Sequence, residues 1–142
     1  MAMHKLKFLG IFIIALLLTN CSNDDENISN PLVELGLIGD WEINGRGINN
    51  ISSLEALCCE TLNFSDDENT RDWKGLYRFN DSSGIVTNGS FNLNDENGII
   101  EFTTENNTTN SLEYNLNDNV LEVWYFDDEG ERHWTTYIKL QS

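Results

Sequence analysis

In the stretch LGLIGDWEIN, residues 35–44, mostly apolar positions alternate with positions of mixed character. One set of alternate positions is mostly apolar and consists of Leu35, Leu37, Gly39, Trp41 and Ile43. The other set is mixed and consists of Gly36, Ile38, Asp40, Glu42 and Asn44. Period-two alternation is typical of a strand with one face buried. The stretch therefore predicts a first β-strand that buries Trp41.

Seven more segments downstream have the same short, alternating character. They span residues 61–64, 73–79, 85–93, 99–103, 111–116, 120–126 and 131–140. Most of the connections between them are short and rich in Asn, Asp and Gly, which favours hairpins. Eight strands joined in this way can close on themselves and leave no free edge. The sequence predicts an all-β domain, an eight-stranded antiparallel up-and-down barrel.

One short helical turn is expected between the first two strands. Ser52 and Glu55 are three residues apart, the spacing of a capping box at a helix start. Leu54, Leu57 and Cys58 would then share one helix face. We expect one or two turns here.

The N-terminus has the pattern of a secretory signal. Lys5 and Lys7 form a basic region, and residues 8–18 carry no charge. Eleven apolar positions are too few for a membrane-spanning helix, which needs about 20. A basic start followed by a short apolar run is typical of a signal peptide. We interpret residues 1–20 as this segment.

The sequence Leu18-Thr19-Asn20-Cys21 resembles the lipobox of bacterial lipoproteins. The resemblance implies that Cys21 is the lipid-attachment site and becomes the mature N-terminus. It departs from the family at Asn20, where a smaller residue is usual. Two or three acyl chains anchor a protein stably, whereas one chain is marginal.

Residues 21–31 are predicted to be an acidic, Asn-rich tether. The run Ser22-Asn23-Asp24-Asp25-Glu26 resembles the acidic export signal of Bacteroidetes surface lipoproteins. A solvated acidic linker is the alternative interpretation. The resemblance implies a lipid-anchored outer-membrane location on the cell surface.

Residues 32–142 have the size of one domain. The whole chain has a formal net charge of −16. Loss of Lys5 and Lys7 with the signal segment would leave six basic and 24 acidic residues, a net charge of −18. Such a charge repels nucleic acids, so we expect no nucleic-acid partner.

Gly39-Asp40-Trp41 resembles the Gly-x-Trp signature on the first strand of lipocalins. That resemblance implies a lipocalin-like barrel in which Trp41 packs across the closed end. We do not expect the long C-terminal helix of lipocalins here, because the last predicted strand runs to residue 140 of the 142 residues.

A barrel of this size is either filled by side chains or holds one small ligand. The candidate ligand-binding residues are the aromatic ones expected to point inward: Trp41, Trp73, Tyr77, Phe91, Tyr114, Tyr125 and Trp134. Gly75 and Gly89 are the interior positions that could leave space.

Trp124 and Phe126 fall on the opposite face of their strand from Tyr125. An exposed aromatic pair can mark a contact site, so these two are the candidate partner-binding residues. A strand covered on both sides, or a bulge, is the alternative.

The sequence offers little for catalysis. His133 has Glu131 two residues away, and a pairing of His133 with Cys58 or Cys59 is conceivable. We expect one of the two adjacent cysteines to be buried, and we expect no enzyme, no cofactor and no metal site. The predicted function is a lipid-anchored binding module for a small apolar or amphipathic ligand. The alternative is a non-enzymatic inhibitor or accessory protein that docks a partner through exposed aromatics and acidic loops.

Overall fold

The computed structural model describes residues 29–54 and 58–141, and almost all of its regular structure is antiparallel sheet. The elements are α2 (Pro31–Glu34), β1 (Gly39–Ile48), β2 (Ile51–Ser52), β3 (Thr61–Asp66), β4 (Lys74–Asn80), β5 (Val86–Asn94), η2 (Asp95–Asn97), β6 (Ile99–Thr104), β7 (Thr109–Asn117), β8 (Val120–Phe126) and β9 (Arg132–Lys139).

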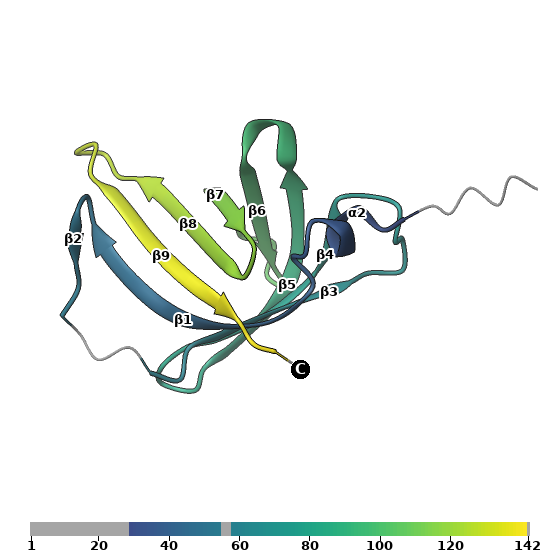
Figure 1. Ribbon diagram of the computed structural model, residues 1–142, viewed down its shortest axis with the longest axis horizontal. Coiled ribbons are helices and arrows are strands. Elements are labelled where there is room, and N and C mark those ends of the chain that lie inside the picture. The colour runs from purple at the N-terminus through teal and green to yellow at the C-terminus, as the bar shows by residue number, and fades with distance from the viewer. Residues whose placement is uncertain (1–28, 55–57, 142) are drawn as a thin grey trace, which may run out of the picture.

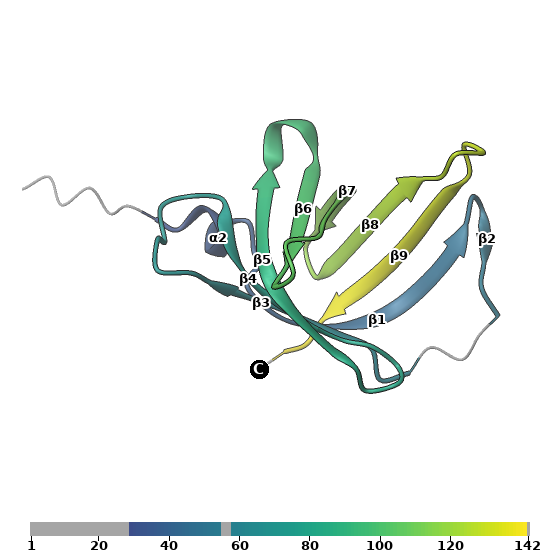
Figure 2. The same cartoon turned by 180° about the vertical axis from the view of Figure 1, so that it is seen from behind.

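The sheet closes into an eight-stranded barrel. Strands β3 to β9 pair in chain order, β3 pairs with β1, and β1 also pairs with β9. The two residues of β2 pair with the C-terminal end of β1 and form a short hairpin there. The β1–β2 and β8–β9 hairpins extend side by side, away from α2 (Figures 1 and 2). The predicted all-β, up-and-down, lipocalin-like barrel is confirmed.

The first strand starts later and runs further than the sequence pattern indicates. It begins at Gly39, where φ is +133°, and continues to Ile48. Residues Leu35 to Ile38 lead out of α2, and Leu37 is nevertheless completely buried. A bulge between Ile43 and Gly45 shifts the register against β9, so alternation does not carry through to the strand end.

The short helical turn lies before the barrel. Asn30 caps α2, and its side-chain oxygen accepts the N–H of Leu32 at 2.9 Å. The Asn30 amide also donates to Asp66 at 2.7 Å, so the end of the predicted tether belongs to the folded domain. Among the described residues, no helix is long and apolar enough to cross a membrane.

The helix predicted near residue 52 is not found at its expected start. Ser52 lies in β2 and pairs with Gly47, so it is a strand residue and not a helix cap. Residues 55–57, which include Glu55 and Leu57, lie outside the described part.

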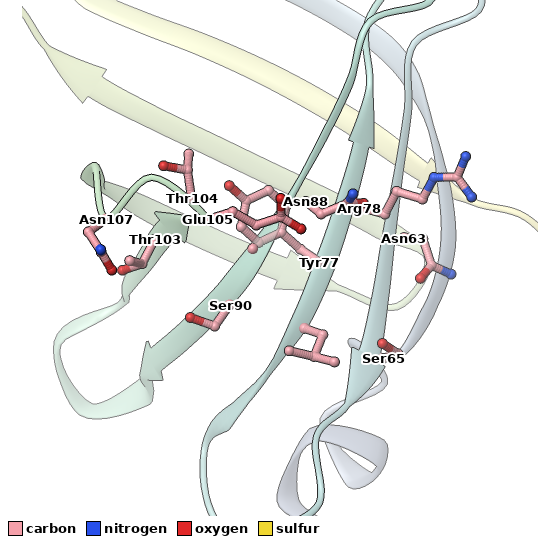
Figure 3. A pocket seen from close by; sticks show the side chains of 12 residues that line it. Asn63, Ser65, Tyr77, Arg78, Asn88, Ser90, Thr103, Thr104, Glu105 and Asn107 are labelled. Atoms are coloured by element: carbon pink, nitrogen blue, oxygen red, sulfur yellow. The ribbon is translucent and has the colours of Figure 1, made fainter.

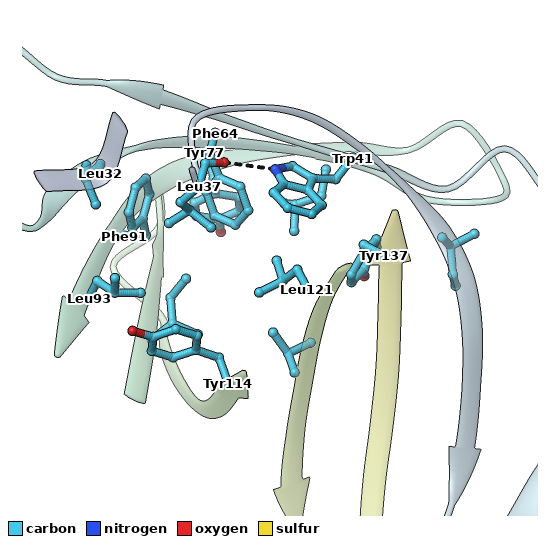
Figure 4. Packing of buried hydrophobic residues seen from close by; sticks show 14 residues of the cluster. Leu32, Leu37, Trp41, Phe64, Tyr77, Phe91, Leu93, Tyr114, Leu121 and Tyr137 are labelled. Carbon is cyan, nitrogen blue, oxygen red and sulfur yellow. Dashed lines mark hydrogen bonds between the residues drawn. The ribbon is translucent and has the colours of Figure 1, made fainter. Parts of the chain in front are cut away.

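The core fills the end of the barrel that α2 covers (Figure 4). Trp41, Leu37, Ile100 and Leu121 are fully buried there. The Trp41 indole donates to the Leu37 carbonyl at 2.9 Å, which ties the strand to the segment before it. All buried core residues of the described part lie between Leu32 and Tyr137, so a chain starting at Ser22 retains this core.

The last strand faces the opposite way from the orientation that an inward-pointing Trp134 would require. Tyr137 is buried, at 6% exposure, whereas Ile138 is 41% exposed. Tyr137 pairs with Ile43 of β1, and this pairing sets which side chains point inward. Both faces of β9 carry large or β-branched residues, so its own alternation does not identify the inner face.

Candidate functional site

The open end of the barrel is hollow. We call this space the mouth cavity; its volume is about 450 Å³. It is lined by residues of β1, β7, β8 and β9 and of the segment after β2: Arg46, Gly47, Ile48, Ser53, Leu112, Val123, Trp124, Tyr125, His133, Trp134, Thr135 and Tyr137. The barrel is therefore solid at one end and hollow at the other.

The floor of the mouth cavity is polar. The Arg46 guanidinium forms an ion pair with Glu60, which is only 7% exposed. The Tyr137 hydroxyl donates to the second oxygen of Glu60 at 3.3 Å. Burial, reinforced by the nearby Glu60 charge, raises the pKa of Tyr137 above its ordinary value, so the hydroxyl stays protonated. Arg46 Nε is buried and has no hydrogen-bond acceptor in the described part of the chain.

The rim of the mouth cavity carries an aromatic and charged cluster. The Tyr125 and His133 rings are stacked, with centroids 4.9 Å apart and planes 6° from parallel. His133 Nε2 lies 2.9 Å from a carboxylate oxygen of Asp127. The hydrogen bond with His133 and those from backbone N–H groups lower the pKa of Asp127.

Four of the predicted ligand-binding residues lie in the core of the barrel. Trp41, Tyr77, Phe91 and Tyr114 are between 0% and 8% exposed and do not line the mouth cavity. The Tyr77 hydroxyphenyl ring lies against Gly89, so the two glycine positions do not leave open space inside; Phe91 fills the position beside Gly75.

The other three predicted interior aromatics differ from expectation. Trp73 precedes β4 and is 37% exposed, so the prediction that it is buried is wrong. Tyr125 is 48% exposed because it lies at the open mouth, not in the core. Trp134 lies across Gly45 and Gly47, and its indole donates to the Asn49 carbonyl at 2.9 Å. The reversed facing of β9 puts its ring on the outer face of the strand, although Trp134 also borders the mouth cavity.

The predicted partner-binding residues lie on the outer face, as expected from alternation. Trp124 is half-buried and pairs across the strands with Trp134, while Phe126 is 56% exposed. The Arg132 guanidinium lies 4.5 Å from the Trp124 ring centroid and forms a 3.1 Å ion pair with Glu122. We call Trp124, Phe126, Arg132 and Trp134 the outer aromatic patch.

A second hollow lies elsewhere on the molecule, outside the core (Figure 3). It has a volume of about 530 Å³ and is lined mainly by polar side chains of β3 to β6 and the loop after β6, including Asn63, Ser65, Arg78, Asn88 and Glu105. The sequence alone does not predict this hollow. The sequence feature that could have indicated this hollow is the placing of polar residues at alternate positions on three neighbouring strands.

The structure does not assemble the conceivable Cys–His pair. The two cysteine sulfurs lie 2.8 Å from each other, while His133 contacts Asp127 and Tyr125. Both cysteines are exposed, so the expectation of one buried thiol is wrong. Cys59 has a φ of +69°, so strand alternation does not apply there. The neighbouring Cys58 thiol raises the pKa of Cys59, which lowers its thiolate fraction.

The predicted lipid-attachment residue, Cys21, lies outside the described residues. Comparison with known proteins adds no family: no protein-family model and no curated protein matches the chain.

Proposed function

We propose that this chain is a lipid-anchored, non-catalytic binding protein that holds a small amphipathic ligand in the mouth cavity. The observation that carries the proposal is a hollow of about 450 Å³ at the open end of a barrel whose other end is filled by the core. Ligand pockets are typically about 300–1,000 Å³, with mostly apolar walls and a few polar groups.

The chemistry of the lining supports an amphipathic ligand. Ile48, Leu112 and Val123 supply apolar wall, and the floor supplies Arg46 and Tyr137. The Arg46 side chain is 36% exposed, so its guanidinium would donate to an acceptor on the polar end of a ligand. The apolar part of the ligand would then lie against the wall towards Tyr125.

A neutral fluorescent probe, N-phenyl-1-naphthylamine, tests the cavity. We expect its emission to rise on binding, and Ile48→Trp to weaken binding at least tenfold because the indole fills the mouth. Ile138→Trp is the matched control, since Ile48 and Ile138 are 40% and 41% exposed and Ile138 lies on the outer face of β9. Equal loss in both variants, or no binding by the wild type, would contradict the proposal.

The proposed anchor rests on the sequence pattern around Cys21. In a bacterial host that processes lipoproteins, an alkyne-labelled fatty acid should be incorporated into the wild type and not into Cys21→Ser. The double variant Cys58→Ser/Cys59→Ser is the matched control and should retain the label. Proteolysis of intact cells tests the proposed surface exposure, because a chain on the cell surface is digested and one facing the periplasm is not.

Docking of a protein partner is the second candidate function, and the outer aromatic patch favours it. Trp and Arg are the residues most enriched among binding hot spots. In a cross-linking pull-down, Trp124→Ala/Phe126→Ala should lose a partner that Leu76→Ala retains; Leu76 is also exposed, but it lies on β4. If the double variant keeps every partner, this second function is wrong.

A further inference from the structure

Three metal-binding side chains meet at the tip of the β8–β9 hairpin. Asp127, Glu131 and His133 each offer one ligand atom, and the three atoms lie within 4.8 Å of one another. All three residues are half-buried. We propose that they form a site for a zinc-type transition-metal dication at the rim of the mouth cavity. This proposal does not depend on the amphipathic ligand.

The closest pair already has nearly the required separation. His133 Nε2 and Asp127 Oδ2 are 2.9 Å apart. Zinc–nitrogen and zinc–oxygen bonds of about 2.0–2.1 Å place two tetrahedral ligands about 3.3 Å apart. A shift of a few tenths of an ångström would admit the ion between these two groups, where it would replace the proton that they share. The Glu131 carboxylate, whose ligand atom lies within 4.8 Å of the other two, would have to move further to complete the site.

The hairpin holds these ligand atoms in place. The other Asp127 oxygen accepts the backbone N–H groups of Glu129 and Glu131, both at 2.9 Å. The His133 imidazole is held against the Tyr125 ring at 4.9 Å between centroids. Ligands that are already oriented lose less conformational entropy on binding.

The local charges favour a dication. Two carboxylates and a neutral imidazole balance a charge of +2. Both arginines near the site have other partners: Arg132 pairs with Glu122 beside Trp124, and Arg46 pairs with Glu60.

The ligand types indicate which metals bind. Imidazole nitrogen suits Zn²⁺, Co²⁺ and Ni²⁺, whereas Ca²⁺ and Mg²⁺ take oxygen ligands. The three side chains leave at least one coordination position of a tetrahedral ion open. The imidazole therefore distinguishes this site from an ordinary acidic surface.

The test uses the chain from Ser22 to Ser142 with Cys58→Ser and Cys59→Ser, so that no thiol can bind metal. We expect Zn²⁺ at about 100 times its Kd to raise the Tm by about 4 °C or more, and Mg²⁺ at equal concentration to leave it unchanged. Co²⁺ should give a visible absorption band. Equal shifts with Zn²⁺ and Mg²⁺, or none with Zn²⁺, would overturn the proposal.

Variants in the same background assign the ligands. His133→Ala and Glu131→Gln should each lower Zn²⁺ affinity at least tenfold. Glu129→Gln removes the same charge from the same hairpin and should not, since Glu129 is exposed and outside the triad. An unchanged Zn²⁺ affinity in His133→Ala would show that His133 is not a ligand and would overturn the proposed site.

A second readout needs no variant at the site. His133 is the only histidine after residue 22, so its imidazole ¹⁵N resonances are unique. In the chain that keeps Asp127, Glu131 and His133, we expect Zn²⁺ to shift the Nε2 resonance of His133. A resonance that does not move at saturating Zn²⁺ would contradict the proposal.

Discussion

At the scale of single residues, Trp41 links the first strand to the segment that closes the barrel. Its ring is fully buried, and its only polar atom donates to the Leu37 carbonyl. The Lys139 ammonium lies 5.4 Å from the ring centroid and also donates to the Gly36 carbonyl. One side chain therefore joins the first strand, the last strand and the chain that leads in from α2.

Trp41→Phe should lower the free energy of unfolding by about 2–4 kcal/mol. The change removes buried ring volume and leaves the buried Leu37 carbonyl without its donor. Urea unfolding followed by circular dichroism measures the loss. Trp134→Phe is the control and should cost less, because the Trp134 hydrogen bond is exposed. Equal losses would show that burial of the Trp41 hydrogen bond is unimportant.

Three tyrosines should make the barrel sensitive to alkali. Burial raises the pKa of Tyr77, Tyr114 and Tyr137, with added contributions from Asp95 beside Tyr114 and Glu60 beside Tyr137. In the unfolded chain tyrosine ionises near pH 10. Above that pH the unfolded state binds fewer protons than the folded state, so stability falls as the pH rises.

The measurement follows tyrosinate absorbance at 295 nm and circular dichroism together from pH 9 to pH 13. We expect the ionisation of these tyrosines to coincide with the loss of β-sheet signal. Ionisation of all four tyrosines while the sheet signal is still intact would contradict this prediction.

At the scale of the elements, two glycines leave room for the backbone and an aromatic ring of neighbouring strands. A Cβ on Gly89 would lie 2.1 Å from the Thr103 carbonyl oxygen and 2.7 Å from the Tyr77 ring. Gly75 has the same relation to the Ser65 carbonyl and the Phe91 ring. The backbone of one strand and an aromatic ring of another thus occupy the space of the missing side chain.

Gly89→Ala should destabilise the barrel by about 1–3 kcal/mol, the usual cost of overpacking. The β5 backbone must move away from β6, because the Thr103 carbonyl cannot rotate aside as a flexible side chain could. The midpoint of urea unfolding measures the effect. Ser90→Ala, at the exposed neighbouring position, should leave the midpoint nearly unchanged. A neutral Gly89→Ala would show that the contact relaxes freely.

At the scale of the whole molecule, charge is the dominant feature. The chain has 24 acidic and eight basic residues. The described part has three ion pairs, Arg46–Glu60, Arg132–Glu122 and His133–Asp127, so most carboxylates of that part have no cationic partner. Such self-repulsion destabilises the compact state.

Salt should therefore stabilise the protein. Raising NaCl from 0.01 M to 0.15 M shortens the Debye length from about 30 Å to about 8 Å, so repulsion between distant carboxylates is screened. We expect the free energy of unfolding to rise by about 1 kcal/mol, which corresponds to a rise in Tm of about 2–5 °C. KCl should act like NaCl. A Tm that stays constant or falls with both salts would contradict this expectation.

The sequence by itself determined the fold class and most strand positions. Strand β8 spans the predicted residues 120–126, and the ends of most other strands moved by only one or two residues. Alternation succeeds here because a strand with one wet face must separate apolar from polar side chains. It also placed Trp41 on the buried face of its strand and Trp124 on the outer face.

Only the tertiary structure decided the candidate site. The inner face of β9 depends on its pairing with β1 past the bulge at Ile43, so Trp134 lies outside and Tyr137 inside. The hollow exists because the core residues cluster at one end, and the approach of Asp127 to His133 depends on the closing of the β8–β9 hairpin. These features come from register and from contacts between residues distant in the chain, which the local pattern of residues does not encode.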